Sequence, residues 1–72
     1  MSEKEAACEL TRLEPEFTSF SPDEQRQFEN ELYLRAYVRG WTGDPLQQPA
    51  ATVVSAIRAV IARRQEPAGC DL

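Results

Sequence analysis

Side chains that could carry out chemistry are few in this 72-residue sequence. It contains no histidine, so general acid–base chemistry would fall to carboxylates, one lysine and two tyrosines. Two close carboxylate pairs occur, Glu14 with Glu16 and Asp23 with Glu24. Catalytic carboxylate pairs face each other across a pocket, whereas neighbouring carboxylates at a helix start are typical of capping. Neither pair therefore indicates catalysis.

The two cysteines are the remaining candidate nucleophiles. Cys8 lies among glutamates, which disfavour a thiolate, and Cys70 lies in a segment with the composition of a loose tail. We expect both to be inert thiols. Because no apolar signal segment precedes them, an oxidised secreted protein is not expected, and we predict a cytoplasmic location.

Motifs for binding metals and phosphate groups are missing as well. The sequence has no CxxC pair and no clustered carboxylate loop, and its three glycines are too scattered for a phosphate-binding loop. No apolar run approaches the length of a membrane span. We therefore expect no enzymatic activity, no cofactor, no metal site and no membrane contact.

Five arginines in the second half of the chain could contact nucleic-acid phosphates, and two helices joined by a glycine-containing turn would then resemble a helix-turn-helix. The turn is longer than usual, and the last helix would begin with Pro-Ala-Ala, where a recognition helix presents polar groups to base edges. The net charge of −4 also disfavours nucleic acid as a partner. A small DNA-binding regulator is thus the alternative function. The five arginines are Arg35, Arg39, Arg58, Arg63 and Arg64.

The stretch YLRAYVRGW at 33–41 combines the residue types that dominate the binding energy of protein interfaces. Its aromatic residues are each four apart, and arginines flank them. We predict that a protein partner binds here; for Tyr33, burial in the core or in a dimer interface agrees equally well with the sequence. The predicted partner-binding residues are Tyr33, Tyr37, Arg39 and Trp41.

A first helix is expected over 3–14. It begins at a capping box, SEKE at 2–5, in which a serine and a glutamate cap each other's backbone amides. Pro15 should end this helix, because the residue before a proline avoids the helical region. The helix has only a narrow apolar stripe.

The second helix is expected over 22–39 and has the clearest boundaries. Ser21 suits the N-cap, Pro22 suits the first helical position, and Gly40 suits the position after the last turn. Its large apolar side chains spread around the circumference, with Phe28 and Tyr37 about 180° apart at 100° per residue. A helix that is apolar on several sides is either central in a core or shared between subunits.

The third helix is expected over 49–65, where apolar residues recur at spacings of three and four. It should form an antiparallel hairpin with the second helix, and 66–72 should be a flexible tail. Since 72 residues are few for one core, we predict a single small domain that assembles as a homodimeric helical bundle. The residues predicted to pack in the core or the dimer are Phe28, Leu32, Leu34, Val38, Val53, Ile57, Val60 and Ile61.

Charge is unevenly distributed along the chain. Residues 1–31 carry nine acidic and three basic side chains, and residues 32–72 carry five basic and three acidic ones. We interpret the acidic half as a solvated surface. Together these features predict a non-enzymatic, all-α module that binds and modulates a larger protein, such as a bacterial regulator or enzyme. Small inhibitors or antiactivators of this kind are typical of bacteria and their phages.

Overall fold

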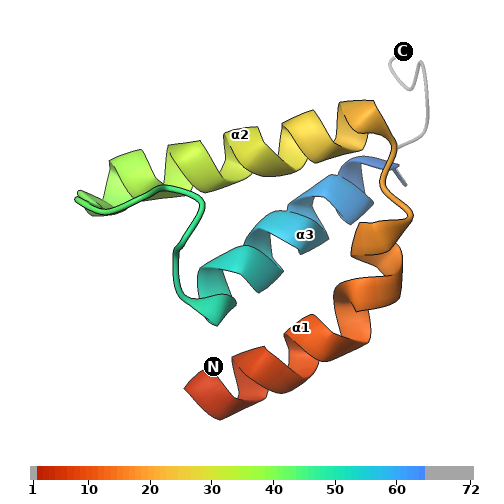
Figure 1. The fold of residues 1–72 in the computed structure, drawn as a ribbon, viewed down its shortest axis with the longest axis horizontal. Helices are drawn as coiled ribbons and strands as arrows, with labels where there is room; N and C mark the ends of the chain where they lie inside the picture. The colour runs from red at the N-terminus through yellow and green to blue at the C-terminus, as the bar shows by residue number, and fades with distance from the viewer. Residues whose placement is uncertain (1, 65–72) are drawn as a thin grey trace.

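The structure is a computed structural model that describes residues 2–64, and within this range it contains three helices and no strand. They are α1 (Glu3–Thr18), α2 (Pro22–Arg39) and α3 (Ala50–Arg64). Helix α3 lies between the other two, packs against both, and runs antiparallel to α2 (Figure 1). The all-α class and the helical hairpin are therefore confirmed, while the predicted tail at 66–72 lies outside the described residues.

Helix α2 begins and ends as the sequence predicts. The Ser21 side chain accepts a hydrogen bond from the Glu24 amide, and the Glu24 carboxylate accepts one from the Ser21 amide at 3.0 Å. After the last turn, Gly40 adopts a left-handed conformation with φ of 68°. This conformation lets the Trp41 amide donate a hydrogen bond to the Ala36 carbonyl at 2.9 Å. A carbonyl in the last turn of the helix thereby gains a hydrogen-bond partner.

The prediction that Pro15 ends the first helix is wrong, because α1 continues to Thr18 with Pro15 inside it. Proline removes one backbone hydrogen bond and clashes with the preceding turn, so packing must offset that cost. The added turn carries Phe17, whose ring packs edge-on against Phe20 and Phe28 at centroid distances of 5.6 and 5.0 Å. In Figure 1 the orange end of α1 turns away from its red beginning, as expected near an internal proline.

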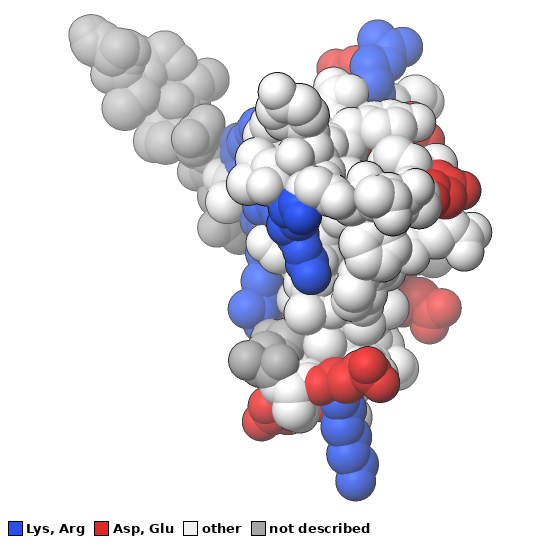
Figure 2. Space-filling model, turned by 90° about the vertical axis from the view of Figure 1, so that its left-hand side faces the viewer, with Lys and Arg blue, Asp and Glu red and all other residues white. Residues whose placement is uncertain are grey.

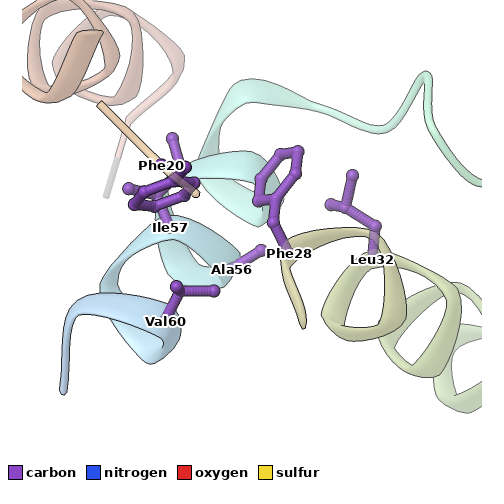
Figure 3. Packing of buried hydrophobic residues seen from close by; sticks show 6 residues of the cluster. All are labelled: Phe20, Phe28, Leu32, Ala56, Ile57 and Val60. Carbon is purple, nitrogen blue, oxygen red and sulfur yellow. The ribbon is translucent and has the colours of Figure 1, made fainter. Parts of the chain in front are cut away.

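The hydrophobic core forms where the three helices meet. Figure 3 shows its members pointing toward one another from α2, α3 and the connection between α1 and α2. Half-buried residues, among them Val53 and Ile61, pack around them. Of the predicted packing residues, Leu34 and Val38 are exposed, so only the dimer alternative remains for these two. The buried cluster consists of Phe20, Phe28, Leu32, Ala56, Ile57 and Val60.

The acidic first half of the chain pairs with the arginines of α3. Glu31 is buried although it carries a charge, because its carboxylate bridges Arg35 and Arg63, the latter at 2.6 Å. Such pairs connect both outer helices to α3, so part of the surface that we interpreted as solvated joins the helices. The other pairs to α3 are Arg58 with Glu9 at 2.6 Å, and Arg64 with Glu24 at 2.8 Å and Glu16 at 3.2 Å.

One of these pairs predicts a pH dependence of stability. Hydrogen bonds from Arg64 and from the Ser21 backbone lower the pKa of Glu24 from 4.5 to about 2. Because the pKa of Glu24 is lower in the folded state than in the unfolded state, the charged carboxylate stabilises the fold. This contribution is present above pH 4.5 and is lost as the pH falls toward 2. Glu24→Gln keeps a side chain suited to the capping box. We expect urea midpoints of this variant to change less over that range than those of the wild type; identical profiles would contradict the assignment.

Candidate protein-docking surface

The second half of α2 presents large apolar side chains to solvent. Tyr37 and Val38 are 85% and 75% exposed, and Leu34 and Tyr33 are 57% and 49% exposed. Trp41 and Leu46, in the loop that follows, are also exposed. Single exposed apolar residues are ordinary, whereas a contiguous group is typical of an interaction site. We call the aromatic part of this group, Tyr33, Tyr37 and Trp41, the aromatic surface.

Hydrogen bonds within the tip of the hairpin connect its residues to one another. The Trp41 indole N–H donates to the Asp44 carbonyl at 3.0 Å, and the ring packs against Gly43. The Asp44 carboxylate in turn accepts from the Leu46 amide at 3.0 Å. A Cβ at Gly43 would lie 3.3 Å from the indole nitrogen, so the absence of a side chain there lets the ring fold over the loop.

Gln48 anchors this loop to α2. Its side chain is buried, and its Nε2 donates to the carbonyls of Leu32 at 2.7 Å and Pro45 at 2.6 Å. This residue was missed in the sequence analysis, because a glutamine beside another glutamine in a polar loop carries no signal of burial. The bond to Leu32 joins the loop to the middle of α2, and the bond to Pro45 lies within the loop itself.

Arg39 does not join the aromatic surface. Its guanidinium donates to the Thr52 hydroxyl of α3 at 2.6 Å. On an α-helix, Arg39 and Tyr37 point about 200° apart, so the two side chains lie on opposite sides of α2. The structure thus keeps Tyr33 and Tyr37 on one edge of the helix, while Arg39 belongs to a different surface.

That different surface is a shallow groove between α2 and α3. Leu34 and Val38 form its apolar side on α2, and small residues of α3, Ala51 and Ser55, form its opposite side. Arg35 crosses the groove and donates to the Ser55 hydroxyl at 3.2 Å. We call this surface the α2–α3 groove. Leu34 and Tyr33 are about 100° apart on the helix, so the groove and the aromatic surface are neighbouring but separate.

Figure 2 views the molecule from the end at which α2 finishes. Much of this face is uncharged, although one basic side chain extends near its middle; further basic side chains lie on the left and acidic ones on the right, and both occur at the top and the bottom. The sequence agrees, because residues 40–51 contain a single charged residue, Asp44. The centre of a protein interface is commonly depleted of charged residues, so the uncharged part of this face suits such a contact.

Other kinds of site have less support. Within residues 2–64, no group of three or more potential ligands could hold a metal ion. No helix in that range is both long and apolar enough to cross a membrane. Cys8 is exposed, and Cys70 lies outside the described residues. No protein family matches the chain, and the comparisons found no similar curated protein and no similar solved structure.

Proposed function

We propose that this chain is a non-enzymatic binding module that docks on a larger protein through the aromatic surface and thereby inhibits or otherwise modulates it. The observation that carries the proposal is the exposure of Tyr33 and Tyr37 on one edge of α2, together with the exposure of Trp41 in the loop that follows the helix. An aromatic side chain that becomes fully covered buries about 150–250 Å². Because Tyr33 and Trp41 are 49% and 37% exposed, the three residues supply only part of the roughly 800 Å² that each partner contributes to a standard interface.

The hydrogen bonds of the tip also support binding. A loop that is already ordered loses little conformational entropy when a partner docks on it. Trp41 is held by the Asp44 carbonyl, and the loop itself is held by Gln48. The tip therefore presents its apolar surface without a large ordering cost.

We further propose that two copies of the chain pair through the α2–α3 groove. Leu34 and Val38 are large, apolar and exposed, and the facing Ala51 and Ser55 are small, with Arg35 lying between the two sides of the groove. A two-fold axis would place the same groove on both subunits, so each apolar edge covers the other. The aromatic surface stays free on each subunit of such a homodimer.

The alternative of DNA binding loses support from the ion pairs. It depends on Arg58, Arg63 and Arg64, and each of these forms an ion pair with a glutamate of its own chain. To reach a phosphate, each arginine would leave that glutamate or bring its negative charge toward the DNA. Either route opposes the electrostatic attraction on which such binding depends.

Affinity capture from cells of the source organism tests the proposed function. The baits are the wild type, Tyr37→Ala and, as a matched control, Arg26→Ala, which removes another exposed side chain of α2. We expect Tyr37→Ala to lower the affinity for a captured protein by about 30-fold, as for an interface hot spot. The control should retain it, and nuclease treatment should not matter. Equal capture by all three baits, or capture abolished by nuclease, would contradict the proposal.

A further inference from the structure

A second apolar site lies away from the hairpin tip, where α1, α2 and α3 meet. Its volume is about 370 Å³, within the range of about 300–1,000 Å³ that is typical of ligand pockets. Phe28 and Ile57 are buried, and the half-buried Leu10, Phe17 and Val53 line the rest of its apolar surface. The pocket is open to solvent on one side, so an occupant can reach its apolar lining from the surface.

The polar part of the pocket carries negative charge. Glu14 is exposed and lines the pocket, and within residues 2–64 it forms no ion pair. Its neighbours Glu9 and Glu16 each form an ion pair with an arginine of α3, Arg58 and Arg64, although Arg64 is shared with Glu24. An occupant that contacts the pocket therefore meets an apolar surface beside one uncompensated carboxylate.

A helical occupant can match the arrangement of these residues. Glu14 lies four residues after Leu10 and three before Phe17, so the three share one face of α1. Residues three or four apart are neighbours on a helix surface. A partner helix with a lysine three or four residues from a large apolar side chain would therefore have the same spacing as Glu14 and its apolar neighbours. Apolar grooves that bind amphipathic helices accommodate apolar side chains at this helical spacing.

We propose that this pocket is a separate docking site for a basic amphipathic helix of a protein partner. The helix places a bulky apolar side chain between Leu10, Phe17 and Val53 and a lysine or arginine against Glu14. None of the residues that line the pocket belongs to the aromatic surface or the α2–α3 groove. Failure of either proposal therefore leaves the other intact.

A synthetic peptide of leucine and lysine tests this inference with the full chain. At about 14 residues it is near the shortest length at which a helix can persist. In methyl NMR spectra, we expect saturable shifts at Leu10, Val53 and Ile57. A leucine–glutamate peptide of the same pattern should cause none. Shifts confined to other residues, or equal binding of both peptides, would overturn the proposal.

Two variants make the test specific. Glu14→Gln should lower the affinity for the leucine–lysine peptide by about two- to five-fold, the range for an exposed ion pair. The control Asp44→Asn also removes one negative charge and should leave that affinity unchanged. Val53→Phe should fill the pocket and lower the affinity for the peptide by about tenfold or more, which corresponds to about 1.4 kcal/mol. Because Glu14 is exposed, Glu14→Gln remains informative even if Val53→Phe disturbs folding; unchanged affinity in Glu14→Gln would contradict the site.

Discussion

Ile57→Ala is expected to lower the free energy of unfolding by about 2–5 kcal/mol. Ile57 is 1% exposed and lies in the cluster that joins α3 to α2 and to the end of α1. A domain of this size has a total stability of about 4–11 kcal/mol, at roughly 0.05–0.15 kcal/mol per residue. The substitution therefore removes a large share of the stability, and Leu32→Ala, equally buried, should behave in the same way.

Urea denaturation followed by circular dichroism measures this loss. A small domain has a slope of about 1 kcal/mol per molar urea, so the midpoint should fall by about 2 M or more. Leu46→Ala is the matched control, because it also truncates an aliphatic side chain but at an exposed loop position. It should change stability by about 0.5 kcal/mol or less. Equal losses at positions 46 and 57 would mean that the core lies elsewhere.

Val38→Glu is expected to convert the proposed homodimer into monomers. Val38 is 75% exposed in the α2–α3 groove, where the proposed two-fold axis brings the same groove of a second copy against it. The substitution places one carboxylate from each subunit in the contact, and like charges in an interface cost several kcal/mol. At 1.4 kcal/mol per factor of ten, the dissociation constant should rise by about 100-fold or more.

Sedimentation equilibrium at micromolar concentration decides this second prediction. The wild type should sediment as a dimer and Val38→Glu as a folded monomer. Ala7→Glu, which adds the same charge at an exposed position of α1, should remain dimeric. A wild type that stays monomeric at these concentrations would contradict the proposed pairing, although the aromatic surface would still be available to a different protein.

The sequence predicted α2 well because its signals are local. Ser21, Pro22 and Gly40 each act on the backbone within one turn, and the structure has the helix boundaries at those residues. The end of α1 was not predictable in this way. Pro15 is a local signal against a helix, and the packing of Phe17 against Phe28, which offsets it, joins residues that are distant in sequence.

The residues of the candidate sites also divide into those placed by local signals and those placed by contacts between distant parts of the chain. The spacing of Tyr33 and Tyr37 places them on one edge of α2, and a helical wheel is enough to see it. Arg39 was grouped with them by sequence proximity, but its bond to Thr52 depends on where α3 lies. The ion pairs of α3 likewise depend on the packing of α1 and α2 against it, which a one-dimensional pattern of charge does not specify.

The central claim, that the aromatic surface binds another protein, is tested most directly by photo-crosslinking in cells of the source organism. A photoreactive phenylalanine derivative replaces Tyr37, and in a control it replaces Arg12, which is exposed on α1. Illumination should join position 37 to one protein other than the chain itself, and position 12 should give no such adduct. The account would be contradicted if position 37 gave no adduct, or only adducts that position 12 gives equally.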